Sequence, residues 1–85
     1  MRPERRKTFN DYVIPHINLR KTGENIARLR KKASLSVKDL QKIFGFGTPQ
    51  AIYKWEQGAA VPAIDNLVFL SVIFGTSIDE ILIIE

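Results

Sequence analysis

The clearest alternation of apolar and polar positions lies in residues 35–58, which contain two short blocks with helical spacing. In the first block, Leu40, Ile43 and Phe44 share one face of a helix. In the second block, apolar side chains again recur at three-residue spacing, and polar side chains occupy the opposite side. The pattern predicts two amphipathic helices joined by a short turn.

Residues with strong cap preferences mark the ends of both helices. Ser36 suits the N-cap of the first helix, with Asp39 near its positive end. Gly45 suits the end of that helix, because glycine readily adopts positive φ. Thr48 is expected to cap the second helix, with Pro49 at its first position, where no N–H is needed.

The second helix combines a buried side with a polar outer face. Ile52 and Trp55 point inward, and Gly58 ends the helix. The outer face carries Pro49, Gln50, Tyr53, Lys54 and Gln57. Trp55 could stack on single-stranded bases, but its spacing from Ile52 favours a place in the core. A polar helix face held on a core is suited to reading another molecule, and DNA is the leading candidate.

A further helix is predicted before this pair and two more after it. Thr22 suits the N-cap of the first of these, whose core positions are Ile26, Leu29 and Ala33. A fourth helix is expected over about residues 63–74 and ends at Gly75. Its core positions are Ile64, Leu67, Leu70, Ile73 and Phe74. Ser77 and Glu80 form a capping-box pattern for a short fifth helix that contains Ile78, Ile81 and Leu82.

The N-terminal 21 residues are expected to form an arm outside the helical domain, which takes residues 22–85. Residues 1–8 are basic and predicted to be a disordered tail whose secondary role is non-specific phosphate contact. Residues 9–19 contain a stretch with β-branched and aromatic residues, but Pro15 interrupts it and restricts it to an edge strand or an extended arm.

The apolar C-terminal residues allow two interpretations. Ile83 and Ile84 could pack at a dimer interface, because such residues are unusual at the exposed end of a small monomer. Alternatively, Leu82–Ile84 could turn extended and pair with Tyr12–Ile14, since both segments have strand-like composition. Either arrangement ties the ends of the chain together.

The charge of the chain is unevenly divided. Residues 1–54 carry all thirteen Lys and Arg with four acids, a net charge of +9. Residues 55–85 carry five acids and no Lys or Arg, a net charge of −5. A basic N-terminal part joined to an acidic C-terminal part suits a protein that turns one face toward a polyanion.

Several other functional classes have little support. The 85 residues suffice for one small domain, and without cysteine there is no disulfide or thiolate metal site. His16, the single histidine, has no cysteine or carboxylate at ligand spacing and is expected at the surface. No signal peptide and no membrane-length apolar run is found. The expectation is a cytoplasmic, non-enzymatic protein without metal or cofactor.

Together, the segments resemble the helix-turn-helix family of phage Cro and repressor proteins, also called the Xre family. The resemblance covers about residues 22–82 and rests on the ordered segments ENIARLR, LSVKDLQKIFG, TPQAIYKWEQG and VPAIDNLVFLSVIFGTSIDEIL. It implies a compact all-α bundle of five helices, sequence-specific binding to duplex DNA, and usually a homodimer on a two-fold symmetric operator. In such proteins the third helix lies in the major groove and the second crosses the backbone.

The resemblance also implies roles for particular residues. The implied base contacts are Pro49, Gln50, Ala51, Tyr53 and Lys54, and the implied backbone contacts are Ser36, Lys38 and Thr48. Gln50 is the strongest candidate, because its amide can pair bidentately with adenine. Lys54 could donate to guanine or reach a phosphate. Arg30 is expected to form a partly buried, structural ion pair with Glu56 beside Trp55.

Four features depart from the family pattern. The turn Gly45–Gly47 is one residue longer than the commonest version, and Val37 stands where many members place a DNA-contacting glutamine. Ser34 occupies a position often held by glycine. Ala63 replaces the usual cap of the fourth helix, which would cost about 1 kcal/mol.

The sequence therefore predicts a small DNA-binding transcriptional regulator, a repressor by resemblance, that acts as a homodimer. Two alternatives stay open. One is an antitoxin or accessory regulator whose arm or C-terminus binds a partner protein. The other is a protein-interaction module that keeps the fold but has lost DNA reading, an idea motivated by Val37 and the longer turn.

Overall fold

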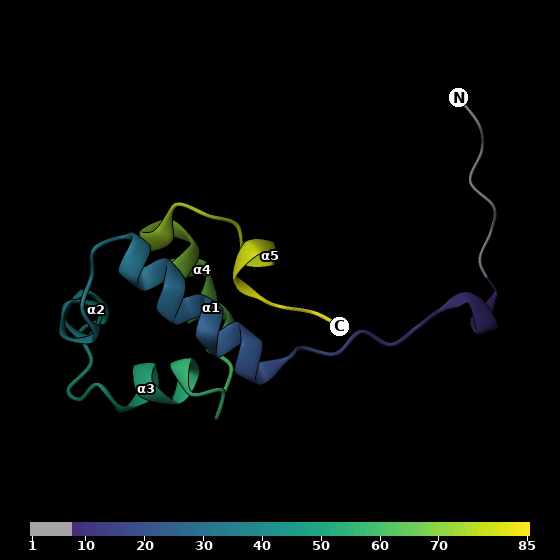
Figure 1. Cartoon of the computed structure of the whole chain (residues 1–85), viewed down its shortest axis with the longest axis horizontal. Coiled ribbons are helices and arrows are strands. Elements are labelled where there is room, and N and C mark those ends of the chain that lie inside the picture. The colour runs from purple at the N-terminus through teal and green to yellow at the C-terminus, as the bar shows by residue number, and fades with distance from the viewer. Residues whose placement is uncertain (1–7) are drawn as a thin grey trace.

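The computed structural model describes residues 8–85, and the basic tail predicted at the N-terminus lies largely outside them. Five α-helices form the body of the protein, and a short 3-10 helix lies in the arm (Figure 1). Their bounds are η1 Phe9–Asp11, α1 Leu19–Lys32, α2 Val37–Phe44, α3 Gln50–Glu56, α4 Ile64–Phe74 and α5 Ile78–Ile81. The all-α, five-helix fold predicted from the sequence is confirmed. Within residues 8–85, no helix is long and apolar enough to cross a membrane.

Each of the five α-helices contributes to one core. The buried apolar side chains are Ile26, Leu29, Leu40, Ile52, Trp55, Leu67, Leu70 and Ile81. All but Ile81 lie at positions that the sequence pattern assigns to the apolar face of a helix. Three other predicted core positions are wrong: Ala33 is exposed at the C-cap of α1, and Ile43 and Ile64 are 43% and 76% exposed. The helices are short and their neighbours cover only part of each apolar side, which periodicity cannot reveal.

Helix α1 begins earlier than predicted. Asn18, and not Thr22, is its N-cap, and the Asn18 Oδ1 accepts a 2.9 Å hydrogen bond from the Lys21 N–H. Thr22 is buried inside the helix, where its hydroxyl oxygen accepts a 2.9 Å hydrogen bond from the Ile83 N–H. A threonine is a common cap because its hydroxyl binds a backbone N–H. Here it does bind one, but that N–H belongs to the C-terminal segment.

The C-terminal segment lies extended and antiparallel to the end of the arm. The backbones of His16 and Glu85 exchange two hydrogen bonds of 3.1 and 2.8 Å, and the Asn18 N–H donates to the Ile83 oxygen at 2.8 Å. Pairing between the two ends is thus confirmed, but the predicted register, against Tyr12–Ile14, is wrong. Pro15 has no N–H for a ladder, and the hydrogen bond between Ile83 and the first turns of α1 sets the register closer to the helix.

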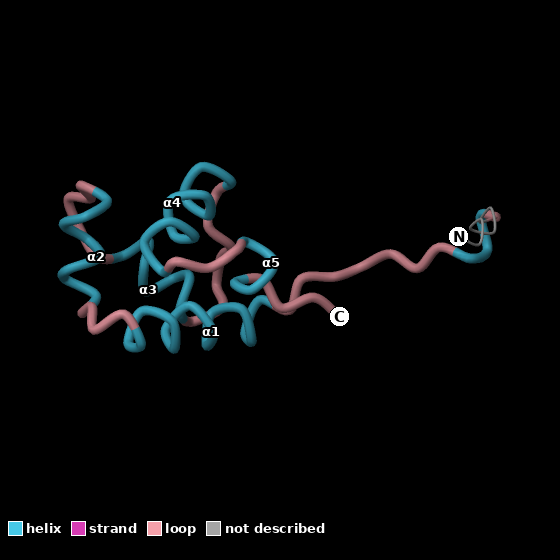
Figure 2. Tube along the Cα trace, turned by 90° about the horizontal axis from the view of Figure 1, so that it is seen from above, coloured by secondary structure: helices cyan, strands magenta, loops and turns pink. Residues whose placement is uncertain are grey.

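The arm before residue 16 projects away from the helical body in both overall views (Figures 1 and 2). Residues 12–15 are extended and exposed, beyond the short η1 helix. Phe9, Val13 and Ile14 are 97%, 88% and 76% exposed. This is the predicted extended arm, although the helical domain begins with α1 at Leu19.

Helices α1 and α3 approach most closely at Gly23. An ideal Cβ built on Gly23 would meet the carbonyl oxygen of Trp55 and lie 2.6 Å from that of Glu56. Contacts this short force the backbone to shift. The absence of a side chain at residue 23 therefore sets how closely α3 is held against α1.

We expect Gly23→Ala to destabilise the protein by about 1–3 kcal/mol, as overpacking of a core does, despite the better helix propensity of alanine. Urea denaturation followed by circular dichroism measures this. Gly47→Ala is the matched control, because the added Cβ there would have no atom within 4 Å and Gly47 is not at positive φ. Equal stability of the two variants would contradict the close approach.

Candidate nucleic-acid interface

The N-terminus of α2 has the cap that the sequence predicts. The Ser36 Oγ accepts a 3.0 Å hydrogen bond from the Asp39 N–H, and the Ser36 N–H donates to the Asp39 Oδ2 at 2.8 Å. The hydrogen bond from the Ser36 N–H to the carboxylate, together with one from the Ser36 side chain, holds the pKa of the Asp39 carboxyl below its usual range. The reciprocal pair fixes where α2 starts, so Ser36 and Lys38 lie at a defined, exposed helix end.

The turn after α2 is anchored by aromatic side chains. Gly45 has the left-handed conformation predicted for it, with φ 73°. The ring of Phe46 stacks on Phe44 at 4.9 Å between centroids and meets Trp55 edge-on at 6.0 Å. The Gln41 Nε2 also donates a 3.2 Å hydrogen bond to the Phe46 oxygen. The longer turn is thus held against the core, which fixes α3 relative to α2.

Helix α3 begins one residue later than predicted. Its N-cap is Pro49, and no side chain caps its first turn. The prediction that Thr48 caps this helix is therefore wrong. Thr48 is exposed in the turn instead. The Pro49 oxygen accepts a 3.1 Å hydrogen bond from the Tyr53 N–H, so the backbone of Pro49 already forms the first helical turn.

The outer face of α3 is polar and exposed, as the sequence predicts. Gln50, Tyr53 and Lys54 are exposed, while Ile52 and Trp55 on the opposite side are buried. Together with Gln57, these three line a shallow hollow of about 280 Å³. Gln57 was predicted to lie on this face, but no contact with DNA was predicted for it. Its spacing of seven residues from Gln50 is the signal that adds it to the group.

The two other predicted base contacts are less accessible than these three. Ala51 is partly buried and packs against the core, and Pro49 is half-buried at the start of α3. The three predicted backbone contacts, Ser36, Lys38 and Thr48, are all exposed. They lie at the start of α2 and just before α3, the two helices that the turn holds together.

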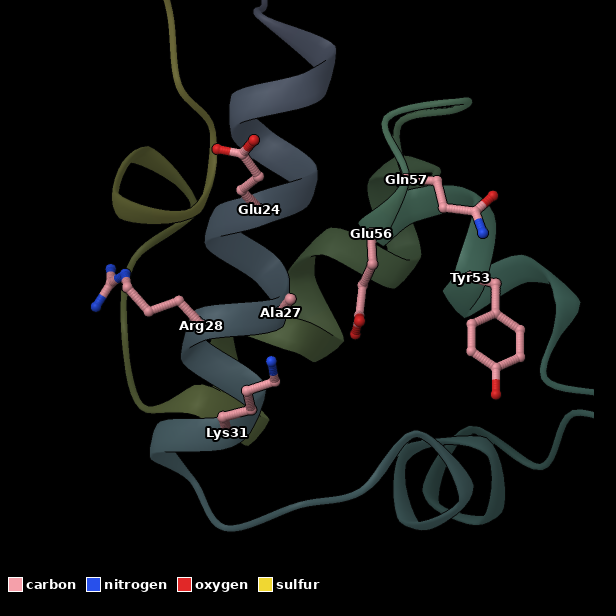
Figure 3. A pocket seen from close by; sticks show the side chains of 7 residues that line it. All are labelled: Glu24, Ala27, Arg28, Lys31, Tyr53, Glu56 and Gln57. Carbon is pink, nitrogen blue, oxygen red and sulfur yellow. The ribbon is translucent and has the colours of Figure 1, made fainter.

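A second hollow, of about 510 Å³, lies between α1 and α3 (Figure 3). Its lining residues are Glu24, Ala27, Arg28, Lys31, Tyr53, Glu56 and Gln57. Figure 3 shows Glu56 reaching from α3 toward α1, whereas Arg28 points away from α3. The Arg28 guanidinium donates to the Asn25 Oδ1 at 2.7 and 3.1 Å. Tyr53 lines both hollows and so joins them at the outer edge of α3.

The predicted ion pair between Arg30 and Glu56 is present. The Arg30 Nε and Nη2 donate to the two carboxylate oxygens of Glu56 at 2.7 and 3.1 Å. Its Nη1 donates to the Leu35 oxygen at 2.9 Å. The two side chains are only 11% and 13% exposed, and the hydrogen bond to Glu56 raises the pKa of Arg30. This bidentate pair ties the end of α3 to α1 and to the loop before α2.

Ser34, one of the departures from the family pattern, has a backbone conformation that is unfavourable for a residue with a side chain. Its φ is 61°, and it is the one non-glycine residue with positive φ within residues 8–85. This conformation disfavours residues with a Cβ, which explains why glycine is common at this place in the family that the sequence resembles.

The arrangement has the geometry of a helix-turn-helix unit: two short helices joined by a fixed turn, with the second packed by its apolar side and polar on the other. Within residues 8–85, no group of three or more His, Cys, Asp or Glu residues is placed to hold a metal ion.

The comparisons with known proteins agree with this geometry. The helix-turn-helix family model matches residues 26–81, which is most of the chain. The chain therefore belongs to the helix-turn-helix family of the Xre and phage-repressor type. Comparisons with curated proteins and with solved structures gave no match. The domains of this family bind DNA in regulatory proteins and are typically not enzymes, so the chain carries a DNA-binding domain.

Proposed function

We propose that the protein is a sequence-specific regulator of transcription that reads the major groove of duplex DNA with α3. The observation that carries this proposal is the exposed group Gln50, Tyr53, Lys54 and Gln57 on a helix whose other side is buried. Amide and ammonium groups at this spacing suit hydrogen bonds to base edges. A rigid helix positions them better than a mobile loop would.

In this proposal the residues of the helix-turn-helix unit divide into two groups. Gln50 pairs with adenine, Lys54 donates to guanine or to a phosphate, and Tyr53 contacts a thymine methyl or a phosphate. Pro49 and Ala51 contribute apolar contact near the start of α3. The backbone contacts are Ser36, Lys38 and Thr48, which fix the register of the protein on the duplex.

The proposed regulator is a cytoplasmic homodimer that represses transcription from a two-fold symmetric site, as helix-turn-helix dimers do when each copy enters one major groove. The second candidate function is binding to a partner protein. The observation that favours it is the apolar arm, where Phe9, Val13 and Ile14 are largely exposed.

Binding to duplex DNA is expected to weaken steeply with salt, because each phosphate contact releases counterions. With Lys38 and Lys54 contacting phosphate in each of two copies, affinity should fall by roughly 100-fold between about 50 and 200 mM salt. Fluorescence anisotropy with a labelled duplex measures the slope. An affinity that stayed constant over this range would argue against the proposed duplex binding.

A further inference from the structure

The hollow between α1 and α3 has no part in the DNA contacts proposed above. It adjoins the hollow on the outer face of α3, because Tyr53 and Gln57 line both. Figure 3 shows Lys31 of α1 and Tyr53 of α3 on opposite sides of it. The polar face of α3 is therefore continued, through this α1–α3 hollow, to a lysine on a different helix.

The charges around the α1–α3 hollow favour an anion. The charged residues that line it are Glu24, Arg28, Lys31 and Glu56. Its two carboxylates are already paired, with Arg20 and Arg30. Arg28 points away from α3 (Figure 3) and donates to Asn25. Lys31 is exposed and has no ion pair or side-chain hydrogen bond with any of residues 8–85. Its positive charge is thus available to a negatively charged ligand.

The width of the major groove places DNA phosphates beside this hollow. The groove is about 12 Å wide, and a helix with its side chains is about 10–12 Å across, so phosphates lie along both flanks of a helix in the groove. Tyr53 follows Ile52 and precedes Lys54, and each step turns the side chain by about 100° around the helix. Tyr53 thus lies on the flank of α3 next to α1, beside the row of Gln50 and Lys54. Its hydroxyl makes no hydrogen bond within residues 8–85.

We propose that a phosphate of the DNA backbone occupies the α1–α3 hollow, where the Lys31 ammonium and the Tyr53 hydroxyl donate to its oxygens. The proposal rests on the proposed function and deepens it, because it adds α1 to the helices that contact DNA. It also assigns Tyr53 to a phosphate and not to a thymine methyl. Contacts to phosphates carry no sequence information but fix the orientation of a protein on the duplex. A contact from α1 would fix the rotation of α3 in the groove.

Lys31→Gln and Lys32→Gln form a matched pair of variants. Both lysines are exposed, and both changes remove one charge from α1, but Lys32 lines a different hollow with Glu80 of the α5 segment. We expect Lys31→Gln to weaken binding by roughly 10-fold, equally for a selected duplex and a scrambled one, and to lower the salt slope by about 1. Lys32→Gln should change affinity by less than about 2-fold. Circular dichroism verifies that both variants are folded.

Two results would overturn the proposal. Equal losses for Lys31→Gln and Lys32→Gln would mean that Lys31 contributes only net charge. Loss of the preference between the two duplexes in Lys31→Gln would mean that its contact is not to a phosphate, since phosphate contacts weaken binding uniformly across sequences.

Neutral methylphosphonates, placed one at a time in the selected duplex, identify the phosphate itself. We expect a position where the substitution weakens the parent by roughly 10-fold but leaves Lys31→Gln unaffected, with Tyr53→Phe affected less than the parent. If every such substitution weakened the parent and Lys31→Gln by the same factor, the assignment would be overturned. A parent without any preference between duplexes would contradict the proposed function alone, because the lysine comparison measures total affinity for duplex DNA.

Discussion

The double variant Gln50→Ala with Lys54→Ala is expected to lose specific DNA binding while keeping its fold. Both side chains are exposed on the outer face of α3, so truncation removes no core contact. Each well-made contact to a base edge contributes about 1–3 kcal/mol of discrimination. Loss of both should weaken binding to the preferred duplex by roughly 30-fold or more and bring it near the affinity for unrelated duplexes.

Anisotropy titrations against the preferred duplex and a scrambled one measure both affinities. Lys21→Ala is the matched control, because it removes one positive charge from a different helix. Lys21 lies in the first turn of α1, and its ammonium is 3.6 Å from the Glu85 carboxylate. We expect a small effect for this control. If the double variant kept the parent affinity and the parent preference, α3 would not be the reading helix.

Glu56→Ala is expected to cause the largest loss of stability among charge substitutions in the chain. It leaves the Arg30 guanidinium without its bidentate partner in a site where both side chains are nearly buried. Removal of one member of such a pair costs about 3–5 kcal/mol, because the remaining charge is desolvated and uncompensated. For a domain whose total stability is about 5–15 kcal/mol, this change brings it close to unfolding.

Urea denaturation of the parent and of two variants measures this effect. Glu24→Ala is the matched control, because Glu24 forms an ion pair with Arg20 at 3.6 Å on the surface. The Arg20 side chain is 76% exposed and the Glu24 side chain 63% exposed. Such a surface pair is worth at most about 1 kcal/mol. Similar unfolding midpoints for Glu56→Ala and Glu24→Ala would show that the Arg30–Glu56 pair does not hold α3 in place.

The sequence predicted the parts of the fold that depend on local chemistry. Gly45 and Gly75 end their helices in the left-handed conformation, and Ser36 caps α2 with Asp39, because these preferences act over a few residues. The inward positions of Ile52 and Trp55 followed from their spacing. The exposed polar face of α3 was therefore predictable together with its core side.

The parts that were wrong depend on contacts between distant segments. Asn18 and Thr22 both suit an N-cap, but the Thr22 hydroxyl is buried and accepts a hydrogen bond from the distant Ile83 N–H. Thr48 loses its predicted role because Phe46 packs into the aromatic cluster and shifts the start of α3. Tertiary packing overrides local propensity in both cases.

The most direct test of the central claim is selection of the purified, folded protein against a random duplex library near physiological salt. We predict enrichment of an inverted repeat whose half-sites are separated by about one helical turn, as two copies of α3 in successive major grooves require. Enrichment of a single unrepeated motif would support sequence-specific DNA binding but contradict binding as a two-fold symmetric dimer. No enrichment would contradict sequence-specific reading by α3 and favour a protein-binding role.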